Sequence, residues 1–167
     1  MNPTAAHEAA GVLGWLAATP LSNAMRTGLW TYPIVEIVHI FGFVVLVGSV
    51  VMFDLRVLGL SKNLSVQAVA RHLLPWSIAA LLLVVPAGLM MFSAHPDDFA
   101  TNNVFLLKLG LIGIAGINAA MFHLGVYRSV PEWDTGVAAP GAAKFQAVLS
   151  IGLWTSVICC GRLLAYT

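Results

Sequence analysis

The chain has 167 residues, of which 59% are hydrophobic and only 9% are charged. Soluble domains carry roughly 25% charged residues, so this composition excludes a disordered chain and an ordinary cytosolic globule. The formal net charge of +1 gives no general attraction to polyanions, which argues against a nucleic-acid-binding protein. Together with a mean hydropathy of +0.89, these values indicate a membrane protein whose main partner is the lipid bilayer.

The N-terminal segment, residues 1–31, contains one short apolar patch with no basic residue ahead of it, unlike a cleavable signal peptide. Apolar residues recur in this segment at roughly helical spacing. We therefore expect an N-terminal amphipathic helix that lies in the outer membrane interface. The alternative is a partly disordered tail.

Four apolar stretches follow, at about 33–58, 72–92, 104–127 and 145–166. A helix needs about 20 apolar residues to cross a bilayer core, and each stretch is that long. The stretches are too long for the strands of a membrane barrel, and a helix satisfies its own backbone groups in lipid. The sequence thus predicts an all-α fold, an integral membrane four-helix bundle over residues 32–167. Ser65 is expected to cap the second span.

Basic residues are concentrated in the loops at one end of the predicted bundle. That end holds Arg56, Lys62, Arg71, Arg128 and Lys144, and the other end holds only Arg26 outside the membrane. By the positive-inside rule the basic end is cytoplasmic. Both termini would then lie outside, which is the periplasm if the membrane is a bacterial inner membrane.

Four ionisable residues within three of the spans share one depth, roughly 8–12 Å to the outer side of the midplane at 1.5 Å per residue. They are Glu36, His39, Lys108 and Arg162. Such residues are costly in a membrane and usually face the bundle interior with a partner. We expect Lys108 and Arg162 to act as electrostatic partners for Glu36 or for an anionic group, such as a haem propionate or a quinone head. The alternative is a charge-neutralising cluster that only sets the helix register.

Two histidines form a second layer, about 12–15 Å to the cytoplasmic side of the midplane by the same count. They are His72 on the second span and His123 on the third. Imidazoles at equal depth on neighbouring helices suit the two axial positions of a haem b iron, so we expect these two residues to be the metal ligands. His39 is the next candidate. In the alternative, His72 contacts headgroups and His123 hydrogen-bonds a backbone carbonyl or Asp54.

Four segments of the sequence carry a resemblance to a known family: YPIVEIVHIFGFVVLVGSVVMFDLRVLGL, RHLLPWSIAALLLVVPAGLMMF, LLKLGLIGIAGINAAMFH and SIGLWTSVICCGRLLAY. From about residue 30 onward the chain resembles an uncharacterised bacterial family of small four-span inner-membrane proteins. It is more distantly similar to CopD-type copper-resistance proteins and to small di-haem cytochrome b bundles. That similarity implies intramembrane histidines that bind metal or haem, although the chain lacks the paired histidines that a di-haem cytochrome has at both depths.

We expect a haem b protein of the bacterial inner membrane that transfers electrons or anchors a redox partner protein, rather than an enzyme with its own substrate. One alternative is a non-catalytic accessory subunit of a larger membrane complex, assembled as a homo- or hetero-oligomer. Another is a small metal-handling or transport protein that uses the layer of Glu36 and His39.

Overall fold

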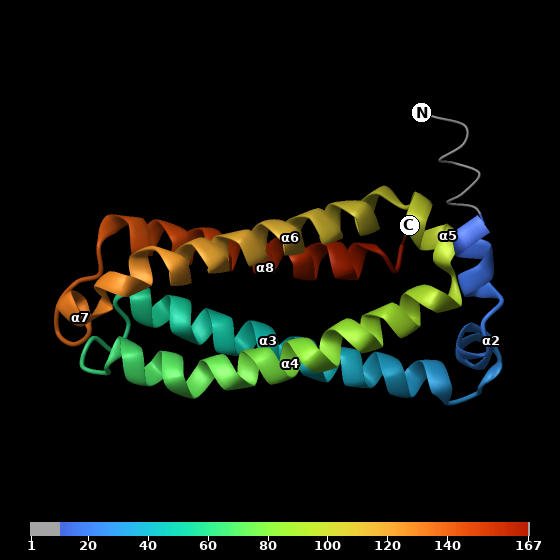
Figure 1. Cartoon of the computed structure of the whole chain (residues 1–167), viewed down its shortest axis with the longest axis horizontal. Coiled ribbons are helices and arrows are strands. Elements are labelled where there is room, and N and C mark those ends of the chain that lie inside the picture. The colour runs from blue at the N-terminus through green and yellow to red at the C-terminus, as the bar shows by residue number, and fades with distance from the viewer. Residues whose placement is uncertain (1–10, 167) are drawn as a thin grey trace. The chain divides into compact units, whose positions relative to one another are not determined.

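The computed structural model describes residues 11–166, and all of their regular structure is helical (Figure 1). Four helices are long and apolar enough to cross a membrane, which confirms the predicted all-α membrane fold. They are α3 (Thr31–Leu58), α4 (Val66–Ala94), α6 (Asn103–Leu124) and α8 (Gly141–Leu163). At most 28% of the most apolar stretch of any span is buried within the chain. The remaining apolar surface suits contact with lipid.

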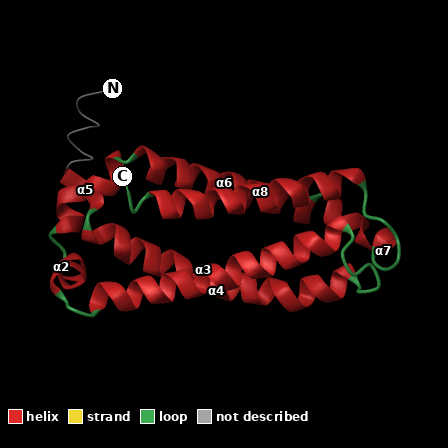
Figure 2. Cartoon of the chain, turned by 180° about the vertical axis from the view of Figure 1, so that it is seen from behind, coloured by secondary structure: helices red, strands yellow, loops and turns green. Residues whose placement is uncertain are grey.

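Shorter helices precede the first span and occupy connections between later spans, with loops drawn green in Figure 2. They are α2 (Pro20–Thr27), α5 (Pro96–Thr101), the 3-10 helix η1 (Val126–Ser129) and α7 (Val130–Trp133). The third span was expected to continue to residue 127, but α6 ends at Leu124. Gly125 follows, and a Cβ there would lie 2.9 Å from the carbonyl oxygen of Met121. A glycine therefore ends the helix where a larger residue would clash.

Helix α4 begins six residues before the predicted start of the second span at residue 72. The reason is a double cap at its first turn. The Ser65 hydroxyl accepts a hydrogen bond from the Ala68 amide at 3.0 Å, which confirms the predicted cap. The Asp134 carboxylate accepts one from the Gln67 amide at 2.8 Å. The first amides of a helix have no partner within the helix. Because Ser65 and Asp134 accept from two of them, α4 can extend beyond the apolar stretch.

The chain divides into two compact units, and the first comprises residues 11–43 and 80–102. In this unit α3 packs against α4, and Gly42 permits the close approach, since a Cβ there would lie 2.8 Å from a methyl of Val84. Residues 11–17 and α2 are helical, as expected for the N-terminal segment, whose first ten residues lie outside the described residues. The Ser22 hydroxyl of α2 donates to the Ser93 carbonyl at 2.6 Å and ties α2 to the end of α4.

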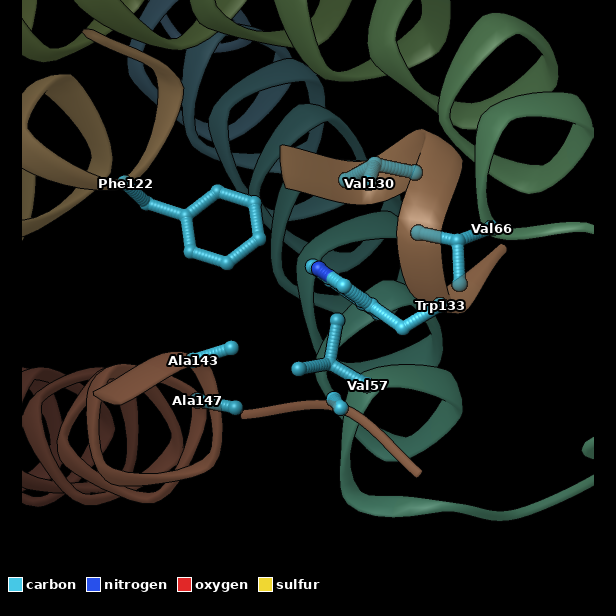
Figure 3. Packing of buried hydrophobic residues seen from close by; sticks show 8 residues of the cluster. Val57, Val66, Phe122, Val130, Trp133, Ala143 and Ala147 are labelled. Atoms are coloured by element: carbon cyan, nitrogen blue, oxygen red, sulfur yellow. The ribbon is translucent and has the colours of Figure 1, made fainter. Parts of the chain in front are cut away.

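The second unit comprises residues 44–79 and 103–166 and holds the main hydrophobic cluster. Helices α6 and α8 lie side by side in it (Figures 1 and 2). Figure 3 shows the indole of Trp133 among side chains of α3, α4 and α7. Its Nε1 donates to the Ser129 hydroxyl at 3.0 Å, so this buried ring leaves no unpaired polar atom. The cluster includes Val57, Val66, Phe122, Val130, Trp133, Ala143 and Ala147.

Candidate functional site

The two histidines expected to hold a haem lie on α4 and α6, in the second unit, and both side chains are exposed. Val66 at the start of α4 and Phe122 near the end of α6 belong to one hydrophobic cluster, which brings these two helix ends together. His123 directly follows Phe122. His72 lies six residues into α4, about 9 Å along the helix axis from Val66. The early start of α4 therefore places His72 further from the cluster than His123.

His123 has a defined ring orientation. Its Nδ1 lies 2.9 Å from the carbonyl oxygen of Ala119, one turn earlier on α6. A bond to a backbone carbonyl is part of the alternative expected for His123, and a metal-ligating imidazole makes the same bond. Because a carbonyl only accepts, Nδ1 of the neutral ring carries the proton and Nε2 keeps its lone pair. The imidazole also packs against two aromatic rings, Phe122 at 5.6 Å and Tyr127 at 5.4 Å between centroids.

The layer of Glu36 and His39 belongs to the first unit. His39 is half-buried, and its Nδ1 lies 3.0 Å from the Val84 carbonyl of α4. Gly88 makes room for the ring, since a Cβ there would lie 3.1 Å from His39 Cε1. Glu36, one turn before His39 on α3, is exposed. A separate apolar cavity of about 200 Å³ lies between α3 and α4 in the same unit, lined by residues that include Val38, Pro86 and Met90.

Lys108 and Arg162 belong to the second unit, on the paired helices α6 and α8. Lys108 is half-buried, and a Cβ on Gly161 would lie 3.8 Å from its Nζ, so its ammonium group is next to the turn that carries Arg162. Arg162 stacks on the ring of Tyr166 at 4.7 Å and donates to its hydroxyl. Of the four residues in the predicted layer, Glu36 and His39 thus belong to the first unit, and Lys108 and Arg162 to the second.

Among residues 11–166, no group of three or more His, Cys, Asp or Glu side chains gathers as a metal-binding cluster. A haem needs fewer protein ligands than a bare metal ion, because the porphyrin itself supplies four ligands to the iron.

A second network was not expected from the sequence, and it surrounds Arg56. The guanidinium is 4% exposed and donates to three backbone carbonyls, those of Lys62, Leu64 and Asp134, at 2.7–3.1 Å. Arg56 therefore binds the loops at this end of the chain rather than a lipid headgroup. The only sequence signal was an arginine beside Asp54 at the end of an apolar run, and it was interpreted as topology alone.

The four apolar helices and the polar groups within them define a multi-pass, all-α membrane protein. A model for a family of unknown function, DUF6644, matches residues 21–167, and the chain belongs to this family. No curated protein and no solved structure matches the chain. The more distant similarity to CopD-type and cytochrome b proteins thus finds no support in these comparisons.

Proposed function

We propose that this protein binds haem b in a bacterial inner membrane and transfers electrons or anchors a redox partner. The observation that carries the proposal is the geometry of His123. A histidine that ligates metal through Nε2 commonly donates its Nδ1 proton to a carbonyl, and His123 makes this bond to Ala119. The exposed ring leaves Nε2 accessible to a group that inserts from the bilayer.

The donor set of the chain fits haem b. His123 and His72 would hold the haem iron. Arg71 and Arg128, which are both exposed, would pair with the haem propionates at the cytoplasmic rim. When bound, the haem would supply one-electron redox chemistry. The protein would orient the imidazole through Ala119 and keep it against the apolar ring of Phe122.

The proposed orientation places α7 and its neighbouring loops in the cytoplasm and both termini in the periplasm. It rests on the excess of lysine and arginine at that end of the spans. Arg56 contributes to this count although its side chain is buried among carbonyls, because the positive-inside rule concerns insertion and not the final contacts.

A reduced-minus-oxidised visible spectrum of the purified full chain tests the function. We expect a Soret band and sharp α and β bands in the wild type. His123→Ala and His72→Ala should each abolish the low-spin spectrum, because only one histidine ligand then remains. His95→Ala is the matched control, since this histidine lies outside the four spans, 3.8 Å from Asp98, and its loss should leave the spectrum unchanged.

Colourless, iron-free protein from haem-supplied cells would refute the haem proposal. Recovery of such protein with a stoichiometric partner in mild detergent would instead favour the accessory subunit. A metal content that falls in Glu36→Gln and His39→Ala would favour metal handling. A haem spectrum unchanged in both His72→Ala and His123→Ala would refute the ligand assignment alone.

A further inference from the structure

Three spans of the second unit carry a buried polar layer that the haem proposal does not use. Its members are Asp54 on α3, Asn118 on α6, and Gln146 and Ser150 on α8. Counted at 1.5 Å per residue, they lie about 6–14 Å inside the nearer ends of their helices. Burial of their side-chain atoms within the chain, rather than this depth, limits the water that reaches them.

Asp54 is the acidic member of the layer, and its side chain is 6% exposed. The Ser150 hydroxyl hydrogen-bonds its carboxyl group. The other oxygen, Oδ2, is buried and has no hydrogen-bond partner among the described residues. No lysine or arginine of residues 11–166 lies within ion-pair distance of it either. A carboxylate here would be a buried charge with one oxygen unsatisfied, which is strongly unfavourable.

Gln146 holds the second unpaired acceptor. Its Oε1 is buried and also lacks a partner within the described part of the chain. The nearby amide of Asn118 does not fill this role, because it donates at 3.0 Å to the backbone carbonyl of Gln146. Gln146 and Ser150 are four residues apart on α8 and thus lie on the same face of that helix. Gln146 therefore lies on the face of α8 that carries Ser150, the residue that interacts with Asp54.

Each of these two buried acceptors lacks a hydrogen-bond donor among residues 11–166, and a carboxylate at Asp54 would also be a buried charge. A hard metal ion takes six or more oxygen ligands and fits this layer poorly, since only two acceptors are unpaired. A proton on Asp54 Oδ2 needs no added space. It removes the charge and converts the oxygen from an acceptor into a donor, so that one proton satisfies both groups.

We propose that Asp54 is a proton-binding site, neutral in the folded protein at neutral pH, with its proton on Oδ2 and Gln146 Oε1 as the acceptor. The bond would link α3 to α8 inside the membrane. Proton release would break this link and leave a charge beside Phe53, which packs edge-on against Phe122 at 5.5 Å. The site is independent of the histidines and of any haem.

None of the charged and titratable groups on the surrounding elements takes the place of this proton beside Asp54. Arg56 on α3 donates to three loop carbonyls. His123 on α6 is exposed and bonds Ala119 of its own helix, and Tyr127 of η1 packs against His123. Lys144 lies two residues before Gln146, and residues two apart on a helix do not face the same side.

Infrared difference spectroscopy of the full chain in lipid bilayers at neutral pH tests the proposal. The C=O stretch of a protonated carboxylic acid is resolved from the bands of a carboxylate. We expect this band in the wild type, its loss in Asp54→Asn, and its retention in Glu132→Gln. Glu132 is an exposed acid on α7 and serves as the matched control. Isotope-labelled aspartate should shift the same band in the wild type, which tests the assignment without any substitution.

Gln146→Leu tests the acceptor. Loss of the hydrogen bond should move the C=O band to higher frequency while Asp54 stays protonated. Only carboxylate bands in the aspartate-labelled wild type would overturn the proposal. A band that keeps its frequency in Gln146→Leu would overturn the assignment of Gln146 as acceptor.

Discussion

At the scale of single residues, Asp134 shows how a loop side chain fixes the start of a distant span. Its Oδ1 accepts from the Gln67 amide, 67 positions earlier in the chain, and from the Ser65 hydroxyl at 3.0 Å. The bond from the Gln67 amide is the main reason that the pKa of Asp134 lies below its ordinary value, with the Ser65 hydroxyl contributing in the same direction. Asp134 is therefore a cap for α4 supplied by the loop that precedes α8.

Replacing Asp134 with alanine should destabilise the folded protein by about 1 kcal/mol at neutral pH, the usual cost of losing a cap. Because the folded pKa is lowered, the carboxylate stabilises the fold above the unfolded pKa of about 3.9 and loses this effect as the pH falls through the folded pKa. Thermal unfolding in detergent, followed by circular dichroism across pH, measures both effects. The difference between wild type and Asp134→Ala should shrink below about pH 4.

Asp134→Asn separates the cap from the charge, since an amide oxygen still accepts from Gln67. This variant should keep most of the stability and lose the pH dependence. Equal destabilisation by Asp134→Asn and Asp134→Ala at neutral pH would mean that the charge, and not the cap, stabilises α4. Glu132→Gln, at an exposed position on α7, should have no effect.

At the scale of elements, Arg56 joins the end of α3 to two loops. Its three acceptors lie 6, 8 and 78 positions away in sequence, so a single side chain connects the turn after α3 with the segment after α7. The turn after α3 includes two residues with positive φ, Gly59 at 112° and Ser61 at 54°. The charge of Arg56 thus maintains a tight turn that has little regular structure of its own.

Arg56→Lys should destabilise this end of the protein by about 2 kcal/mol or more, because one ammonium cannot replace the planar fork that serves three carbonyls. We expect a lower unfolding temperature and faster tryptic cleavage after Lys62 in the turn. Lys62→Gln, assayed by unfolding temperature, removes a basic residue from the same end without breaking the network, because the Lys62 side chain is exposed. Equal losses of stability in the two variants would contradict the role assigned to Arg56.

The long helices could be predicted from the sequence because apolar length is a local property, and Ser65 could be predicted as a cap because it acts three residues away. The contribution of Asp134 to the same cap could not be predicted, because Asp134 and the start of α4 are far apart in sequence and meet only in the folded chain. Without this cap, the sequence predicts the second span from residue 72, whereas α4 begins at Val66. The depth assigned to His72 rested on that start.

At the scale of the whole molecule, the site was harder to predict than the spans. Sequence patterns place an ionisable group at a depth but do not define its partners. For His123 the partner is Ala119 of the same helix, and for Asp54 it is Ser150 of α8. Hydrogen bonding of this kind depends on helix rotation, and spans that are apolar on every side encode rotation weakly.

The orientation in the membrane is also a property of the whole molecule, and it decides which solution reaches each end of the spans. Cysteine labelling tests it after Cys159 and Cys160 are replaced by alanine. We expect a membrane-impermeant maleimide to label Asp97→Cys, on α5, in intact spheroplasts, and to label Val137→Cys, before α8, only after lysis. Both positions are exposed, so equal access to reagent is expected once the membrane is opened. The reverse pattern would place the α7 loops in the periplasm, and any haem on His123 would then face periplasmic redox partners.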